Sequence, residues 1–325
     1  MKFAVIGTNF ISDLFCEAAR EVEGAEVAAV LSRSRERGVA FAQRHSVKTV
    51  FTDLCELLSA EDIDAVYIAS PTLCHATQAV RCMRSGKAVL CEKMMGAELS
   101  DTLWMQRVAR DEGVVLLEAM RPAHDPAYGV IKKSLGRLGK IRRATLEFCQ
   151  YSSRYDRFRQ GEVLNAFDPK MKNSALSDIG IYPLTVALML FGKPTRVHLS
   201  SVFLENGFEG SGILTLSYPD KGVTVAYSKI TEGVNPSVIE GEEGSLTINK
   251  LTSPTELILR LRGKAPEIIP VPTAENNMVY EIRAFMDAVN LRRDPTPFTE
   301  LTEAAARIVD EVYRQEGIAE HFPKD

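Results

Sequence analysis

The first 121 residues alternate short apolar runs with helix-like segments, and this alternation constrains the fold more than any other feature of the chain. Each apolar run is rich in β-branched residues and is bounded by a turn residue or a charge, as in strands buried on both faces. Helical stretches, such as residues 13–21 and 99–112, lie between the runs. Repeated strand–helix units of this kind predict an α/β domain with a parallel sheet covered on both faces. The predicted strands are KFAVIG (2–7), AEVAAVLS (25–32), a short strand at 49–51, AVYIAS (65–70), AVLCE (88–92) and VVLLEA (114–119).

The pattern changes after RPAHDP (121–126), where two prolines interrupt the chain and the alternation stops. We therefore predict one domain over residues 1–121 and a second over 122–325. Turn signals, such as residues 219–222 and 241–244, separate the strand-like runs of the second domain, which predicts a mainly antiparallel sheet. Helices complete this α+β domain. The predicted strands span 141–148, 195–204, 211–217, 223–228, 237–240, 245–248 and 256–261, and the predicted helices include one that ends near 135–140 and two at 277–291 and 300–315.

Composition narrows the class of partner. A chain of 325 residues suits two domains. Its 45% hydrophobic residues, 25% charged residues and net charge of -4 are ordinary for a globular protein, so we expect a small-molecule partner and neither nucleic acid nor membrane. The six cysteines form no C-x-x-C pair, so we expect reduced thiols and no metal. The first apolar run is too short for a signal peptide and the run at 182–191 too short for a bilayer, so we expect a cytoplasmic location.

The turn after the first predicted strand is a candidate dinucleotide site. It reads GTNFIS (7–12) where such a turn has G-x-G-x-x-G, directly before a helix. Ser12 is small enough to replace the third glycine, whereas Asn9 places a side chain where the pyrophosphate would lie. We expect Asn9 either to donate its amide to that group or to displace it. A plain strand-to-helix turn is the alternative. The predicted cofactor contacts in this turn are Gly7, Thr8, Asn9, Phe10 and Ile11.

The end of the second predicted strand indicates which cofactor binds. A cofactor without a 2'-phosphate usually meets an Asp or Glu there. This chain instead reads LSRSRER (31–37), in which Ser32, Arg33 and Arg37 offer a hydroxyl and two guanidinium groups near a helix N-terminus. Such groups suit a phosphate dianion, so the sequence favours NADP over NAD. A solvated, arginine-rich helix start is the alternative.

Three further stretches carry a family resemblance: YIASPTLCHATQAV (67–80), GKAVLCEKM (86–94) and SALSDIGIYPLTVALMLFG (174–192). Together they resemble the glucose-fructose oxidoreductase and inositol dehydrogenase (Gfo/Idh/MocA) family. The resemblance implies a Rossmann domain that binds a nicotinamide cofactor over residues 1–121, and a C-terminal α+β domain with a large open sheet for substrate binding and oligomerisation. It also implies an NAD(P)-dependent dehydrogenase or reductase that transfers hydride between nicotinamide and a sugar, polyol, diol or related carbonyl compound, in a homodimer or higher homo-oligomer.

The resemblance also implies roles for individual residues. Ser70, Pro71 and His75 match a family turn that lies against the cofactor. Glu92 and Lys93 match the E-K-P motif, which contributes to the cofactor site and carries the active-site lysine. Asp178 and Tyr182 match the D-x-G-x-H/Y element, whose tyrosine form most resembles dihydrodiol dehydrogenases, glucose-fructose oxidoreductase and xylose dehydrogenases. Inositol dehydrogenases carry histidine at that position.

These residue types suit alcohol oxidation. Removing hydride from an alcohol carbon also requires loss of the hydroxyl proton, so a base and a charged group must lie within hydrogen-bond reach of the oxygen. Lys93 and Tyr182 supply both, because an ammonium close to a phenol favours the phenolate. Asp178 precedes Tyr182 by about one helical turn, so both can face one cleft and Asp178 can bind a substrate hydroxyl. Taken singly, each has an ordinary reading as an exposed charge, a packed ring or a helix cap.

Departures from the family pattern support a second hypothesis. Met94 replaces the proline of E-K-P, so we expect a less fixed backbone after Lys93 and no tendency toward a cis bond. Residues 172–174 read KNS where the family usually has glycines, and we expect these side chains to narrow the approach to the nicotinamide. The alternative is therefore a cofactor-binding sensor or regulator on the same fold with little or no turnover.

Arg154, Arg157 and Arg159 lie where family members often build the substrate rim.

Overall fold

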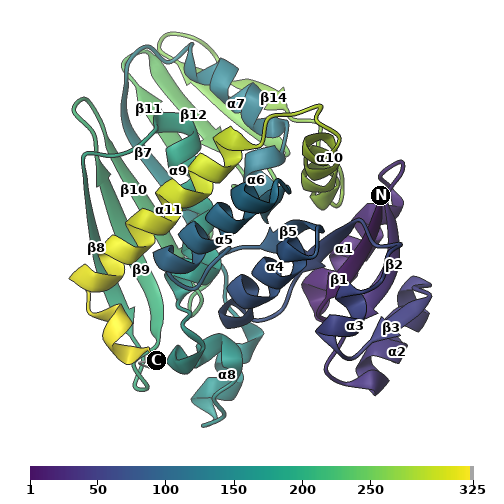
Figure 1. Ribbon diagram of the computed structural model, residues 1–325. Helices are drawn as coiled ribbons and strands as arrows, with labels where there is room; N and C mark the ends of the chain where they lie inside the picture. The colour runs from purple at the N-terminus through teal and green to yellow at the C-terminus, as the bar shows by residue number, and fades with distance from the viewer. Residues whose placement is uncertain (323–325) are drawn as a thin grey trace. The chain divides into compact units, whose positions relative to one another are not determined.

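The computed structural model describes residues 1–322, and the chain forms two compact units. The N-terminal unit contains Met1–His124 and Ala274–Glu303, and the C-terminal unit contains Asp125–Thr273 together with residues 304–322 (Figure 1). The predicted boundary at 121/122 therefore lies three residues before the observed division. The prediction also assigned residues 274–303 to the second domain, whereas they pack in the first. Sequence order gives no sign of this return, because it depends on an apolar helix face that reaches the core of the first unit.

The N-terminal unit is built on a six-stranded parallel sheet with the order β3-β2-β1-β4-β5-β6. Its strands are β1 Lys2–Ile6, β2 Glu26–Leu31, β3 Thr49–Phe51, β4 Ala65–Ile68, β5 Ala88–Glu92 and β6 Leu116–Ala119. All six were predicted, each within two residues at either end. The order reverses between β1 and β4, and such a reversal leaves a crevice at the carboxyl ends of the strands where ligands of α/β sheets bind.

Helices cover both faces of this sheet. Successive side chains in a strand point to opposite faces, and here both sets are apolar, so both faces must be shielded from water. Phe3 and Val5 pack into one apolar layer, and Ala4 and Ile6 pack into the other. In the first layer the ring of Phe15 stacks on that of Tyr67 with centroids 3.8 Å apart. The helices are α1 Phe10–Arg20, α2 Arg35–His45, α3 Leu54–Leu58, α4 His75–Arg84, α5 Leu99–Glu112, α6 Arg121–His124 and α10 Met278–Val289, with a 3-10 turn, η1, at Thr72–Cys74.

The C-terminal unit is built on an eight-stranded sheet with the order β14-β13-β12-β11-β7-β10-β9-β8. Neighbouring strands are antiparallel except β7 and β10, which run parallel. The strands are β7 Ile141–Cys149, β8 Arg196–Phe203, β9 Glu209–Ser217, β10 Gly222–Ser228, β11 Ser237–Gly241, β12 Gly244–Ile248, β13 Glu256–Leu261 and β14 Glu267–Pro270. The predicted open, mostly antiparallel sheet is therefore confirmed. The edge strand β14 was not predicted.

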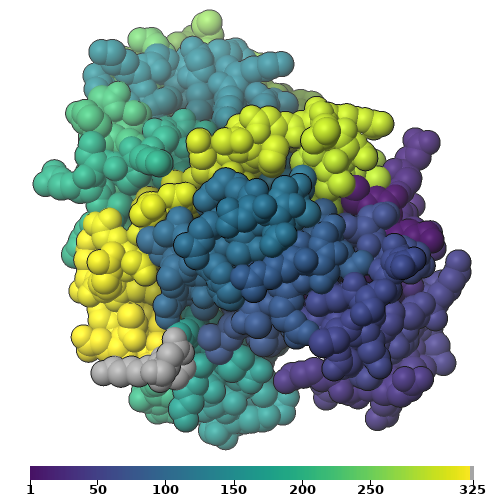
Figure 2. Space-filling model, viewed as in Figure 1, coloured from purple at the N-terminus to yellow at the C-terminus, as the bar shows by residue number. Residues whose placement is uncertain are grey.

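Helical segments accompany this sheet, and one of them carries the D-x-G element. They are α7 Ala127–Leu135, α8 Ser153–Arg159, the 3-10 turns η2 Asn165–Phe167 and η3 Pro169–Met171, the π-helical turn η4 Leu176–Gly180, α9 Ile181–Phe191, α11 Thr296–Gln315 and the 3-10 turn η5 Ile318–His321. The end of α11 that follows residue 304 crosses the sheet, and the space-filling view shows its other side on the surface in yellow (Figures 1 and 2). Across residues 1–322, every helix is too short or too polar to cross a membrane.

Candidate active site

The turn after β1 joins the ends of three neighbouring strands. Gly7 has a φ of +110°, and a Cβ built there would lie 2.7 Å from the carbonyl oxygen of Ala69. The Gly7 amide donates to the Leu31 carbonyl, at the end of β2, over 3.1 Å. A side chain at this position would meet strained backbone and a steric clash, so this glycine is required by the protein's own packing. The turn therefore lies at the switch point between β1 and β4, where a dinucleotide would meet the N-terminus of α1.

Asn9 is the N-cap of α1. Its Oδ1 accepts from the backbone amide of Ser12 over 3.2 Å, and its Nδ2 donates to the Ala69 carbonyl over 2.7 Å. Ser12 is fully buried, so a small residue fits the close packing expected of the third motif position. Phe10 has 72% of its surface exposed beside this turn. The side-chain amide of Asn9 is thus bound to protein backbone, while the residue itself remains exposed.

The arginine-rich segment begins α2. Ser32 is buried, and its amide donates to the Phe51 carbonyl over 3.1 Å. Ser34 caps the helix by accepting from the backbone amide of Arg37 over 3.3 Å, a role that the sequence analysis did not assign. The side chains of Arg33 and Arg37 are exposed. Two guanidinium groups therefore flank a helix N-terminus beyond the end of β2, a donor set that fits a phosphate dianion.

His75 lies between the turns after β4 and β5. Its Nε2 lies 2.8 Å from the Ser70 carbonyl oxygen, and its Nδ1 lies 3.0 Å from that of Met94. Burial lowers the pKa of His75, and the two carbonyl contacts oppose that shift. A neutral imidazole has one N–H and donates to only one of these oxygens. The residue therefore holds two turns of the predicted cofactor site in place.

Glu92 ends β5 in a buried position directly before Lys93. Its Oε1 accepts from the Tyr67 hydroxyl over 2.6 Å, and its Oε2 accepts from the Lys93 amide over 3.2 Å. Burial raises the pKa of Glu92, whereas the Tyr67 hydrogen bond and the charge of Lys93 lower it. Both carboxylate oxygens are therefore engaged by the N-terminal unit, where they orient the start of the Lys93 turn.

The backbone after Lys93 differs from the sequence expectation. The Lys93–Met94 peptide bond is cis, so the expectation that Met94 makes this form unavailable is wrong. The turn is held without a proline ring, because the Met95 amide donates to Glu118 Oε1 over 2.8 Å. The other oxygen of Glu118 accepts from the Thr302 hydroxyl over 3.0 Å, and burial raises the pKa of Glu118 to about 7. Glu118 is a supporting residue that the sequence analysis missed.

Asp178 and Tyr182 lie on one continuous helical run in the C-terminal unit. Asp178 belongs to η4 and Tyr182 to the first turn of α9. The run is irregular where it begins, because η4 is a π-helical turn that ends at Gly180. A Cβ on Gly180 would lie 2.8 Å from the ring of Tyr227 in β10, so glycine lets this turn approach the sheet. Tyr182 is 6% exposed, whereas the Asp178 side chain is 40% exposed.

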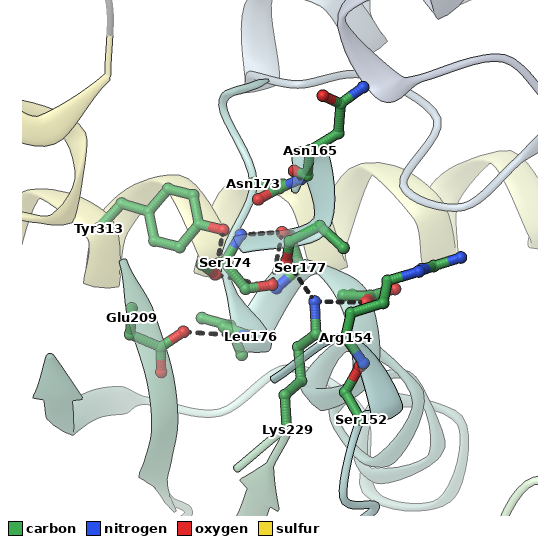
Figure 3. Close-up of polar contacts among 12 residues, drawn as sticks. Ser152, Arg154, Asn165, Asn173, Ser174, Leu176, Ser177, Glu209, Lys229 and Tyr313 are labelled. Atoms are coloured by element: carbon green, nitrogen blue, oxygen red, sulfur yellow. Dashed lines mark hydrogen bonds and ion pairs between the residues drawn. The ribbon is translucent and has the colours of Figure 1, made fainter. Parts of the chain in front are cut away.

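Buried polar residues hold the start of this helical run (Figure 3). The Leu176 amide donates to Oε2 of the buried Glu209 over 2.9 Å. Ser174 is fully buried, and its Oγ lies 2.7 Å from the Tyr313 hydroxyl. The Asn173 amide group donates to the Asn165 carbonyl over 3.0 Å. Ser174 and Asn173, which replace family glycines, therefore have side chains that bond within the C-terminal unit.

Lys229 is the residue near Asp178 that the sequence analysis did not identify. It follows β10 and has a side chain that is 5% exposed (Figure 3). Its Nζ lies 2.8 Å from Asp178 Oδ2. A lysine after a strand is ordinarily a surface charge, so no local signal marks it.

On α8, Arg157 makes two hydrogen bonds to Glu162, of 2.7 and 2.6 Å, and Arg159 lies 4.0 Å from Asp156. These two rim arginines are paired locally.

Lys93 belongs to the N-terminal unit, and Asp178 and Tyr182 belong to the C-terminal unit. Their meeting in one active site is therefore an expectation from the family resemblance. Within residues 1–322, no three His, Cys, Asp or Glu side chains are grouped as a metal ion would require. All six cysteines are free, and three of them, Cys16, Cys82 and Cys91, are buried.

A parallel sheet with a glycine turn at its switch point is typical of dinucleotide-binding α/β domains, and here an α+β unit follows it. A family model described as an oxidoreductase family with an NAD-binding Rossmann fold, GFO_IDH_MocA, matches residues 1–120, and the model of the GFO/IDH/MocA C-terminal domain matches residues 134–247. The chain belongs to this family.

Similar proteins include dehydrogenases from several organisms. The chain is 40% identical over its full length to scyllo-inositol 2-dehydrogenase (NADP(+)) IolU of Bacillus subtilis, covering 99% of that protein. It is 27% identical to trans-1,2-dihydrobenzene-1,2-diol dehydrogenase of Mus musculus, with all of the chain and 99% of that enzyme covered. A crystal structure of KijD10, a 3-ketoreductase from Actinomadura kijaniata with NADP and TDP-benzene, superimposes with a TM-score of 0.87 at 24% identity over 97% of each chain, which shows the shared fold.

Proposed function

We propose that this protein is an NADP-dependent dehydrogenase that oxidises a CH–OH group of a cyclic polyol or related sugar or diol, and reduces the corresponding ketone. The observation that carries the proposal is the ion pair between the half-exposed Asp178 and the buried Lys229. Asp178 lies about one helical turn before Tyr182. Such a carboxylate is an acceptor for substrate hydroxyls. The name of IolU supports testing a cyclic polyol first. The tyrosine form of the motif favours the branch of dihydrodiol dehydrogenases, glucose-fructose oxidoreductase and xylose dehydrogenases, so a diol and a sugar are tested beside it.

NADP is the proposed cofactor because of the groups at the start of α2. Arg33 and Arg37 are exposed there beside the buried Ser32, at the site where a ribose-binding acid would favour NAD. The name of IolU specifies NADP(+), which supports the same choice. The turn at residues 7–11, in which Asn9 and Phe10 are exposed, is proposed to receive the pyrophosphate. Ser70, Pro71 and His75 are proposed to shape the pocket wall beside it.

In the proposed reaction the bound cofactor supplies the hydride acceptor. Tyr182 exchanges the proton of the substrate hydroxyl, and the ammonium of Lys93 stabilises the negative charge that develops on the oxygen. Asp178 accepts a hydrogen bond from a neighbouring substrate hydroxyl and so orients the carbon that reacts. Glu92 and Glu118 fix the backbone on either side of the Lys93 turn.

A substrate panel tests this proposal. NADP+ and NAD+ reduction is measured at 340 nm with scyllo-inositol, myo-inositol, xylose and a trans-dihydrodiol, and the wild-type protein is compared with Lys93→Met and Tyr182→Phe. We expect turnover of at least one polyol with NADP+, loss of turnover in both variants, and unchanged NADPH binding by Tyr182→Phe. NADPH binding without turnover of any panel member would instead support the sensor hypothesis, which the dehydrogenase relatives do not favour.

A further inference from the structure

Lys229 is a buried cation in the C-terminal unit, and its side chain is 5% exposed. Its Nζ lies 2.8 Å from Asp178 Oδ2 and donates to the Ala166 carbonyl over 2.7 Å. The same ammonium lies 4.7 Å from the ring centroid of Phe167 and 5.1 Å from that of Phe208. Both rings are fully buried. The ammonium is therefore held by a carboxylate, a carbonyl and two aromatic faces.

Burying the Lys229 ammonium has an unfavourable desolvation free energy. Moving an ammonium out of water is unfavourable, and replacing a buried ion pair with apolar residues is often neutral or stabilising. The neighbouring side chains Phe158, Phe167 and Phe208 already form an apolar cluster, to which a methionine in place of Lys229 would add. Packing alone therefore does not explain a lysine at this position.

The two members of the ion pair, Lys229 and Asp178, differ in solvent exposure. Lys229 is 5% exposed, whereas Asp178 is 40% exposed. The ammonium of Lys229 is therefore on the buried side of the ion pair, and part of the Asp178 side chain is accessible to solvent. The backbone of Asp178 is fixed independently, because its amide donates to the Ser174 carbonyl over 3.0 Å and Glu209 holds the preceding turn at Leu176. The ion pair with Lys229 restricts the rotation of the Asp178 carboxylate.

We propose that Lys229 is a positioning residue for substrate recognition: it turns the Asp178 carboxylate so that its accessible side accepts hydrogen bonds from adjacent hydroxyls of an uncharged polyol. This inference rests on the proposed function. The ion pair has no net charge, so the pair favours neutral hydroxyl donors over a cationic or anionic substrate group. Lys229 acts through Asp178 and makes no contact with the reacting atoms.

Kinetic variants test the inference, with a matched control at the other end of the same strand. Lys229→Met removes the cation, and Lys229→Arg keeps a charge. Lys221→Met is the control, because Lys221 precedes β10 and pairs with the exposed Asp220 over 2.5 Å. We expect Lys229→Met to lower kcat/KM for scyllo-inositol, or for the best polyol of the panel, by about 10- to 100-fold, the range of one charge-assisted hydrogen bond. Lys229→Arg should recover part of the loss, and Lys221→Met should stay within about twofold of wild type.

A double-mutant cycle separates positioning from general stabilisation. The dissociation constant of the same polyol is measured by calorimetry on NADPH-loaded protein, a readout that does not require turnover. Lys229→Met should weaken polyol binding in the wild-type background and change it by less than about twofold in the Asp178→Asn background. NADPH affinity and the melting temperature confirm that each variant is folded; if Lys229→Met does not fold, the same cycle is run with Lys229→Arg, which should show a smaller effect with the same dependence on Asp178.

The outcomes distinguish this inference from the proposed function. The role of Lys229 would be overturned if Lys229→Met lowered polyol affinity equally in the wild-type and Asp178→Asn backgrounds. It would also be overturned if Lys229→Met bound the polyol within twofold of wild type. Neither result would contradict the dehydrogenase activity. Absence of wild-type turnover across the panel would instead overturn the proposed function.

Discussion

The side-chain amide of Asn9 donates a hydrogen bond to the backbone carbonyl of Ala69 over 2.7 Å, and so ties the turn after β1 to the end of β4. The same side chain caps α1 through its Oδ1. The sequence predicts that this amide donates to the pyrophosphate or displaces that group, and this stays a prediction. One N–H of the amide is bonded to the protein, and that bond shapes the proposed cofactor turn.

Asn9→Ala should therefore destabilise the protein and weaken cofactor binding together. Losing an N-cap costs about 1 kcal/mol, and losing the bond to Ala69 costs about 1 kcal/mol more. The measurements are chemical unfolding and NADPH titration by fluorescence. Asn9→Asp is the matched variant, because it keeps the cap and removes the amide donor. If Asn9→Ala matches wild type in both measurements, the bridge has no energetic role.

Gly7→Ala should be more harmful than an ordinary glycine substitution. Gly7 combines a φ of +110° with a carbonyl oxygen 2.7 Å from the position of a Cβ, so the loss should reach roughly 2–3 kcal/mol. Gly86→Ala is the control, since Gly86 has a φ of +74° and nothing within 4 Å of its Cβ position. Thermal unfolding of both variants measures the difference, and equal melting temperatures would show that the contact with Ala69 can relax.

Arg33→Ala should change cofactor preference and leave stability unaltered. The exposed guanidinium is proposed to bind the 2'-phosphate, so NADPH affinity should fall about tenfold while NADH affinity stays the same. Arg84→Ala removes an exposed arginine from the end of α4 and controls for the overall change in charge. An equal response of both cofactors to Arg33→Ala would remove this residue from the 2'-phosphate site.

Glu118 should make stability fall as the pH rises. Burial raises its pKa from 4.5 to about 7, so the folded protein retains a proton that the unfolded chain releases between these values. The contribution of this group is most favourable below about pH 4.5 and is lost as the pH rises through 7, by up to about 3 kcal/mol. Glu118→Gln should remove that dependence and keep the bond from the Met95 amide. Unfolding free energies of both proteins at pH 5 and pH 8 test it, and parallel curves would contradict it.

The framework can be predicted from the sequence where the signal is local. Periodicity and turn residues alone predict the strands of both sheets except β14, and the helix α5 at 99–112. The turn at Gly7 and the arginine-rich start of α2 can be found in the same way, because both lie directly after strands. Lys93, Asp178 and Tyr182 were found through resemblance to a family, since a single lysine, aspartate or tyrosine has no distinctive pattern.

What the sequence alone determined is therefore the order of elements, the class of both sheets and the family. Only the tertiary structure decided the return of α10 to the N-terminal unit, the role of Glu118 and the pairing of Lys229 with Asp178. The physical reason is distance along the chain: Lys229 lies 51 residues after Asp178, and Glu118 lies 23 residues after the amide that it accepts from. Periodicity reports which face of an element is buried, whereas ion pairs and buried carboxylates depend on which elements the fold brings together.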